Sequence, residues 1–337
     1  MAIDTQPGHR LDKRPGGKRG PNPARRVVED TGRVLQDNGA LVALLVLVLV
    51  LSFWTSNFFT ATNLLNVGVQ AAVTAILAFG VTFAIVSGGI DLSVGSVAAF
   101  SGVMLGWFTT TQGMPVFLGV LLASLAGTAC GLLNGILISY GKLPPFIATL
   151  AMLSAARGLA QVVSEGSPVV LPDSLSWIGK TIGEWLPVPV IVMILMGLLA
   201  ALVLNRTYSG RSMYAIGGNE EAAHLSGIRV RRQKLVIYTL VGAFAAVAGI
   251  VLASRLASAQ PTAAEGYELD AIAAVVIGGA SLAGGVGKAS GTLIGALILA
   301  VLRNGLNLLD VSAFWQQVVI GVVIALAVLL DTLRRRA

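Results

Sequence analysis

The chain has 337 residues, of which 55% are hydrophobic and only 12% are charged, and its mean hydropathy is +0.82. A soluble protein of this length needs more polar surface, whereas repeated apolar runs of about 20 residues are typical of transmembrane helices. The net charge of +7 comes mainly from the tails and from segments between apolar runs. It therefore indicates membrane orientation, and nucleic acid is excluded as the expected partner.

The N-terminal segment, residues 1–38, is predicted to be a solvated, disordered tail in the cytoplasm. It contains 8 basic and 5 acidic residues, is rich in Pro and Gly, and shows no apolar periodicity. It is too long and too polar for a secretory signal, and no small-residue cleavage site follows a short apolar core. Its basic residues favour the cytoplasmic side.

The apolar runs that follow predict an all-α integral membrane domain over residues 39–333, with about ten transmembrane helices. The predicted spans lie at 39–59, 64–87, 92–109, 115–140, 145–164, 188–205, 234–256, 268–283, 290–309 and 314–332. The run at 268–283 is short and rich in Gly. It is therefore also interpreted as a re-entrant or broken helix.

The distribution of Lys and Arg sets the expected orientation. With an inside N-terminus, the loops 88–91, 141–144, 206–233 and 284–289 are cytoplasmic. The external segments between the spans contain one basic residue, Lys180. This asymmetry fits the positive-inside rule with both termini in the cytoplasm. The longest external loop, 165–187, contains Trp177 and Trp185, which suit the membrane–water interface.

One polar segment, Arg206–Lys234, interrupts the apolar sequence and contains six of the 23 Lys and Arg residues. Within it, Glu220–Gly227 is predicted to form a short helix that a Gly closes. A solvated helix between membrane spans offers a contact surface to a cytoplasmic protein.

Two Gly-rich stretches resemble each other. Val86–Gly95 and Val276–Gly285 each pair a Gly-Gly with a Leu three residues later, which is consistent with an internal repeat and with broken helices. Asp91 lies in the first stretch. It is interpreted either as a cap that accepts backbone N–H bonds or, with Ser93, as part of a transport pathway.

Polar residues within the apolar runs suit a neutral polar substrate, although each also suits a hydrogen bond between helices. The candidates for the pathway are Asp91, Ser93, Asn66, Gln70, Asn134, Thr149 and Asn304. Acidic residues near the outer ends of the spans are either ordinary loop residues or part of a docking rim for an external protein. The candidates for docking are Glu165, Asp173, Glu265, Glu268 and Asp270.

No catalytic or nucleotide-binding motif is present. A phosphate-binding loop around Gly287-Lys288 fails, because Leu282 replaces the required Gly and Ala289 replaces Ser or Thr. Two His and one Cys do not support zinc chemistry or a Cys-His nucleophile. The chain is therefore expected not to be an enzyme, and neither a metal nor a cofactor is expected.

Four blocks resemble the ribose-type permeases, the membrane subunits of bacterial ABC importers for monosaccharides. They are S-G-G-I-D-L-S-V-G-S at 87–96, L-P-P-F-I-A-T-L-A-M-L at 143–153, G-R-S-M-Y-A-I-G-G-N-E-E-A-A-H-L-S-G-I at 210–228 and A-A-V-V-I-G-G-A-S-L-A-G-G-V-G at 273–287. The resemblance covers residues 40–332. It implies a multi-pass protein of the bacterial inner membrane that forms the translocation pathway for a monosaccharide or related neutral polyol.

The resemblance also implies partners: an ATP-binding cassette subunit that hydrolyses ATP, a periplasmic sugar-binding protein, and a second permease copy, identical or not. Importer permeases carry Glu-Ala-Ala, three residues, Gly, nine residues and Ile-x-Leu-Pro. Here Glu221–Ala223, Gly227 and Ile237 fit, whereas Thr239-Leu240 replaces Leu-Pro. The implied ATPase-coupling residues are Gly210, Arg211, Tyr214, Gly217, Gly218, Asn219, Glu220, Glu221, Ala222, Ala223 and Gly227.

One alternative function uses the same repeat and broken helices. A gradient-driven secondary transporter or channel for a small neutral solute needs no cytoplasmic docking helix. Such proteins usually place ionisable residues deep in their spans, and here Asp91 is the main candidate.

Overall fold

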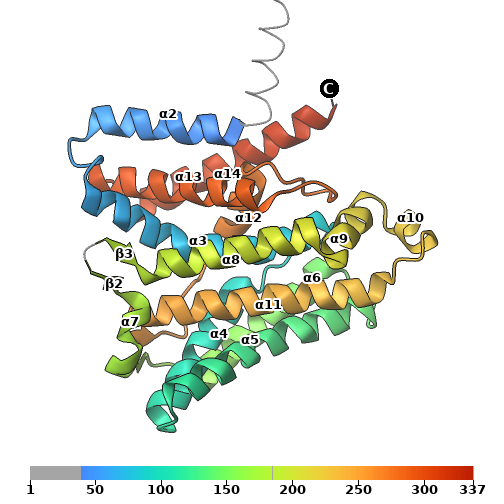
Figure 1. Ribbon diagram of the computed structural model, residues 1–337, viewed down its shortest axis with the longest axis horizontal. Coiled ribbons are helices and arrows are strands. Elements are labelled where there is room, and N and C mark those ends of the chain that lie inside the picture. Colours follow the sequence, from blue (N-terminus) through green and yellow to red (C-terminus); the bar gives the residue numbers. More distant parts are fainter. Residues whose placement is uncertain (1–38, 184, 337) are drawn as a thin grey trace, which may run out of the picture. The chain divides into compact units, whose positions relative to one another are not determined.

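A computed structural model describes residues 39–183 and 185–336, so the predicted tail at 1–38 lies outside the described residues. Most of the described residues are helical (Figure 1). The longer helices are α2 Gly39–Trp54, α3 Ala61–Val86, α4 Val94–Gly106, α5 Val116–Ser139, α6 Pro145–Val163, α8 Val188–Arg206, α9 Tyr208–Gly218, α11 Val230–Arg255, α12 Tyr267–Ile277, α13 Ala289–Leu308 and α14 Ala313–Arg336. The shorter elements are a π-helical turn Trp107–Thr111, a 3-10 turn Asp173–Leu175, α7 Ser176–Gly179, α10 Glu220–Leu225, β1 Val169–Val170, β2 Thr181–Ile182, β3 Leu186–Pro187 and β4 Ser258–Ala259.

Seven helices in the described part of the chain are long and apolar enough to cross a membrane. They are Ala61–Val86, Val94–Thr111, Val116–Ser139, Pro145–Val163, Val188–Arg206, Val230–Arg255 and Ala289–Leu308. The all-α membrane class is therefore confirmed. The other three predicted spans contain helices with shorter apolar parts, and α12 has only 11 residues. At about 1.5 Å per residue, α12 covers roughly half of a ~30 Å hydrocarbon core. The count of ten crossings stays a prediction.

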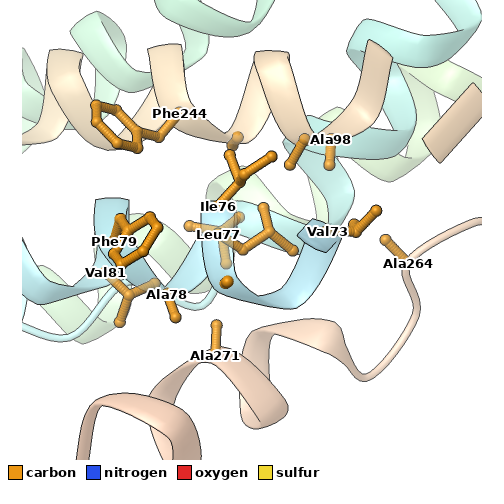
Figure 2. Close-up of a cluster of buried hydrophobic side chains, with 14 of the residues drawn as sticks. Val73, Ile76, Leu77, Ala78, Phe79, Val81, Ala98, Phe244, Ala264 and Ala271 are labelled. Carbon is orange, nitrogen blue, oxygen red and sulfur yellow. The ribbon is translucent and has the colours of Figure 1, made fainter. Parts of the chain in front are cut away.

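Helix α3 is the centre of the packing. Its residues are buried from Ala71 to Val86, and it contacts α8, α11, α12 and α13. Figure 2 shows α3 between α11, which carries Phe244, and α12, which carries Ala271. Small residues let these helices approach closely, since an added Cβ at Gly249 of α11 would overlap the backbone of Ala98 in α4. The best-buried helix therefore adjoins most of the others.

Helices α5, α6 and α8 have mainly exposed faces. These faces consist of large apolar side chains, among them Phe117, Leu133, Leu159 and Leu198. In water such a surface would aggregate, whereas in a bilayer it contacts lipid. The fold therefore needs a membrane around these three helices.

Two helices end at glycine breaks, as the Gly-rich stretches predict. Helix α3 ends with Gly88 at φ 80°, where Gly88 N–H donates to the Ile85 carbonyl at 2.9 Å and Gly89 N–H donates to the Ala84 carbonyl at 2.9 Å. Helix α12 ends before Gly279 at φ 90°. The two breaks have the same local cause, because Gly adopts positive φ without a Cβ penalty. An internal repeat remains an interpretation.

Short strands pair within the predicted external loop, 165–187, and join it to the segment after α11. Strand β1 pairs antiparallel with β4, with Val169 opposite Ala259. Strands β2 and β3 pair around the end of the same loop. These strands and α7, which carries the exposed Trp177, lie at the end of the helices opposite α10 (Figure 1).

Candidate functional site

The polar segment Arg206–Lys234 folds as two helices at a sharp corner. Asn219 ends α9 and caps α10, since its Oδ1 accepts the Ala222 N–H at 2.9 Å. Gly227 has φ 85° and closes α10 by donating to the His224 carbonyl at 3.0 Å. The short helix predicted over Glu220–Gly227 is therefore confirmed, and its two ends follow from an Asn cap and a left-handed Gly.

The surface of α10 is open. Ala223 is buried against Ile216 and Val230, which hold the helix by a small apolar cluster. Leu225 points outward with 81% of its surface exposed. Beside it lies a hollow of about 810 Å³ lined by Tyr140, Glu220, Glu221, His224, Gly227, Ile228, Arg229, Val230, Arg231 and Arg232. An exposed Leu beside a hollow with both signs of charge is suited to contact with another protein.

An ion pair fixes α10 to α11. Lys234 Nζ lies 2.7 Å from both carboxylate oxygens of Glu220. The Lys234 side chain is 19% exposed and that of Glu220 is 56% exposed, so solvent weakens the pair but does not remove it. The ion pair is therefore a direct side-chain contact between the short helix and the start of α11.

The end of α9 lies against the break after α3 and against Gly284–Gly285, in the segment between α12 and α13. Gly285 N–H donates to the Val86 carbonyl at 2.8 Å, and a Cβ added at Gly217 would overlap that carbonyl oxygen. Tyr214 donates its hydroxyl to the Gly287 carbonyl at 2.7 Å. Burial raises the pKa of Tyr214 above its usual value, which keeps the hydroxyl protonated as a donor. We call this contact of Val86–Gly88, Gly217 and Gly284–Gly285 the glycine junction.

Four of the predicted pathway residues meet in one buried network. Asp91 Oδ1 accepts both the backbone N–H of Ser93, at 2.7 Å, and its hydroxyl, at 2.6 Å. Asn134 Nδ2 donates to the Ser93 Oγ at 3.0 Å, and Thr149 Oγ1 accepts the Leu92 N–H at 3.2 Å. All four side chains are almost fully buried. Asp91 therefore forms an Asx-turn that holds the segment between α3 and α4 against α5 and α6.

Comparisons with known proteins connect this geometry to a family. The family model described as branched-chain amino acid transport system / permease component matches residues 63–328. Ribose import permease protein RbsC from Bacillus subtilis (strain 168) is 48% identical over 88% of this chain and 93% of its own. RbsC from Escherichia coli (strain K12) is 47% identical over 88% and 94%, and the L-arabinose transport system permease protein AraH of that strain is 40% identical over 91% and 93%. No solved structure matches the chain.

The chain belongs to this family of transport permeases. The membership agrees with the predicted resemblance and with the apolar helices of a multi-pass membrane protein. It also agrees with the expectation that the chain is a transporter component.

The other three pathway candidates of the permease lie away from the Asp91 network. Asn66 is exposed on α3. Asn304 is buried and exchanges two side-chain hydrogen bonds with Asn63, at 2.8 and 2.9 Å. Gln70 borders a separate cavity between α3, α11, α12 and α13. The predicted pathway residues therefore do not form one group: four belong to the Asp91 network, and the other three lie elsewhere.

The candidate docking residues also differ in their surroundings. Glu165, Asp173 and Glu265 are exposed, and Glu268 is partly buried. Asp270 is buried and pairs with Arg303, whose Nη2 lies 2.6 Å from its Oδ2. The carboxylates of Glu165, Asp173 and Glu265 are accessible to another protein, whereas that of Asp270 is buried between helices.

Sequence reasoning missed three contacts that matter here. They are the Lys234–Glu220 pair, the glycine junction and the Asp270–Arg303 pair, each of which joins different helices or the segments that follow them. Opposite charges within or beside apolar runs were a usable signal for the last pair. Within residues 39–183 and 185–336, no three His, Cys, Asp or Glu side chains gather in a metal-binding arrangement.

Proposed function

We propose that this permease forms the translocation pathway of an ABC importer for a monosaccharide or related neutral polyol. The observation that carries the proposal is the exposed helix α10. An ion pair joins α10 to α11, and the preceding helix, α9, contacts the glycine junction. The relatives named for ribose and L-arabinose support a sugar as the substrate. The family description names branched-chain amino acids, but the 40–48% identity to the sugar permeases favours a sugar.

The proposed partners follow from the missing ATPase motif. ATP hydrolysis occurs in a separate ATP-binding cassette subunit, which receives Leu225 and the charged edge of α10 in a cleft. A periplasmic sugar-binding protein docks at the opposite end, where Glu165, Asp173 and Glu265 are exposed. A second permease copy, identical or not, completes the pathway. The protein lies in the bacterial inner membrane with both termini in the cytoplasm.

The proposed coupling uses three rigid contacts in sequence. Closure of the cassettes pushes α10, the corner at Asn219 passes the displacement to α9, and Gly217 presses on the glycine junction. Because α3 ends at this junction and Gly284–Gly285 lie between α12 and α13, the displacement tilts these helices and changes which side of the passage is open. The residues of the polar segment are thus coupling residues, and the Asp91 network keeps the first break in register.

An exposed apolar residue gives a direct test of the coupling surface. Leu225→Asp removes the apolar contact without disturbing a packed core, because Leu225 is 81% exposed. The cassette is expected to bind the variant about thirtyfold or more weakly, as loss of an interface anchor of about 2 kcal/mol or more implies. Affinity is measured by titrating labelled cassette onto the permease in nanodiscs.

A matched control is Val170→Asp, because Val170 is 69% exposed and lies in β1, which pairs with β4 just after the last residue of α11, whereas α10 adjoins the first residues of α11. It is expected to bind the cassette as the wild type does. Wild-type affinity of Leu225→Asp would contradict the coupling role of α10. Gly227→Trp, which puts a bulky side chain at φ 85°, is expected to abolish docking while the spans remain folded.

The rival function, a gradient-driven secondary transporter or channel, makes an opposite prediction. Uptake by the ABC importer stops when ATP is withdrawn and continues when an ionophore dissipates the ion gradient. Uptake that persists without ATP and collapses with the gradient would favour the rival. Proteoliposomes with the permease, its cassette and its binding protein separate the two.

A further inference from the structure

A polar cavity of about 140 Å³ lies between α3, α11, α12 and α13, at the end of these helices opposite the glycine junction. Its lining is Gln70, Thr74, Arg255, Tyr267, Asp270, Ala296, Leu299, Ala300 and Arg303. Helix α3 contributes Gln70 from the first half of its length and Thr74 from its middle, α11 contributes its last residue, Arg255, and α13 contributes residues from Ala296 to Arg303. The cavity therefore lies near the N-terminal half of α3. It is distinct from the polar segment and from the Asp91 network.

The charged groups of the cavity are held in fixed positions. Asp270 is buried, and Arg303 Nη2 lies 2.6 Å from its Oδ2 and over the Tyr267 ring at 6.0 Å from the centroid. Arg255 donates to the Val69 carbonyl at 3.3 Å. Ionisable residues inside a membrane protein are expensive, and they usually mark a substrate or ion pathway. A purely structural contact between α12 and α13 is available to apolar side chains at lower cost.

The hydrogen-bonding groups that line the cavity indicate which kind of molecule it can bind. The carboxylate of Asp270 accepts hydrogen bonds, the guanidinium groups donate them, and the Gln70 amide does both. The Gln70 side chain makes no hydrogen bond within the part of the chain that the structure describes, so both functions are free. A metal ion is disfavoured, because it lacks a second carboxylate in this lining and two guanidinium groups repel it. Neutral molecules with several hydroxyl groups match the mixture of donors and acceptors.

The volume of the cavity limits the size of the molecule that it can bind. It corresponds to about five water molecules at ~30 Å³ each, which is the scale of one sugar ring and too small for a disaccharide. We propose that this cavity is a transit site, where Gln70, Asp270 and Arg303 bind the hydroxyl groups of a monosaccharide after it leaves the binding protein. The assignment rests on the proposed import function and gives it a contact site within the permease. Binding is weak, because a transported molecule must also leave.

The test compares transport with ATP hydrolysis in the complete importer. The permease, its cassette and its binding protein are reconstituted in proteoliposomes and supplied with radiolabelled D-ribose or L-arabinose. Gln70→Leu removes a donor and an acceptor while the Asp270–Arg303 pair stays intact. Uptake is expected to fall about three- to tenfold, as the loss of one or two hydrogen bonds implies, while ATP hydrolysis stays at the wild-type rate. More ATP is then consumed for each sugar imported.

The control is Gln161→Leu, the same change at an exposed position of α6 outside the cavity, and it is expected to leave both rates unchanged. Unchanged uptake in Gln70→Leu would overturn the transit site and leave the proposed function standing. An equal fall of uptake and ATP hydrolysis would also overturn it, since that pattern indicates structural damage. If the unmodified importer transported L-leucine and neither sugar, that result would instead overturn the proposed function, and the transit site with it.

Discussion

Gly285 donates its backbone N–H to the carbonyl oxygen of Val86 at 2.8 Å, although 198 intervening residues separate them in the sequence. The bond joins the end of α3 to the segment between α12 and α13. Gly217 from the polar segment lies against both residues without a side chain between them. Three parts of the chain thus meet through backbone atoms, and the proposed coupling runs through this contact.

The first prediction concerns the fit at the glycine junction. Gly217→Ala places a methyl group on the Val86 carbonyl oxygen, so α9 must shift away. Overpacking of this kind costs about 1–3 kcal/mol. Uptake per ATP hydrolysed is expected to fall, since α9 no longer fits against both Val86 and Gly285. The measurements are sugar uptake and ATP hydrolysis in proteoliposomes.

The control for this change is Gly158→Ala in α6, where an added Cβ meets nothing within 4 Å. It is expected to retain the wild-type ratio of uptake to ATP hydrolysis. If Gly217→Ala also retains that ratio, the junction does not transmit motion.

The second prediction concerns the ion pair between α10 and α11. Lys234→Met leaves Glu220 without its partner, and the effect on global stability is expected to be at most about 1 kcal/mol for such an exposed pair. The local effect is larger, because α10 has only six residues and few other tertiary contacts. Hydrogen exchange of the α10 amides is expected to accelerate, as followed by mass spectrometry.

The matched variant Lys234→Arg keeps the positive charge and a donor for Glu220. Its α10 amides are expected to exchange at nearly the wild-type rate. Equal exchange in the wild type and in Lys234→Met would mean that the pair does not hold α10.

The third prediction separates the charge of Asp91 from its hydrogen bonds. Asp91→Ala removes the acceptor of the buried Ser93 N–H and hydroxyl, and an unsatisfied buried donor costs about 1–3 kcal/mol. Asp91→Asn retains an acceptor oxygen at the same position. The thermal midpoint in detergent is therefore expected to fall clearly for Asp91→Ala and only slightly for Asp91→Asn.

Transport by Asp91→Asn provides the counter-test. If the residue acts through its Asx-turn, this variant imports sugar at close to the wild-type rate. A stable Asp91→Asn permease without uptake would assign the negative charge a direct role in the pathway.

The fourth prediction concerns Asp270 and Arg303. Asp270→Leu leaves the partly buried Arg303 without its carboxylate, and breaking such a pair costs up to about 3–5 kcal/mol, less where solvent reaches the charge. The double variant Asp270→Leu/Arg303→Met removes both charges and is expected to recover most of the lost thermal stability. Differential scanning fluorimetry measures the midpoints.

Uptake by the double variant is expected to remain low, because the transit site has lost its charged hydrogen-bonding groups. Recovery of both stability and uptake would show that the two residues act only in packing.

Local sequence patterns predicted much of this permease because their causes are local. Apolar runs give membrane helices, Gly227 closes α10, and Gly88 ends α3. The short apolar length of α12 also follows from its sequence, although the number of full crossings does not. The sets of pathway and docking residues were too broad, because each polar residue in a span has two explanations that only its neighbours distinguish.

By itself, the sequence determined the membrane class, the position of the polar segment, the absence of an ATPase motif and the family resemblance. Only the tertiary structure decided which polar residues act together. It placed Asp91, Ser93, Asn134 and Thr149 in one buried network and Gln70, Asp270 and Arg303 around a cavity. It also brought Val86, Gly217 and Gly285 into backbone contact. Hydropathy and turn preference depend on adjacent residues, whereas these contacts depend on how distant helices pack around α3.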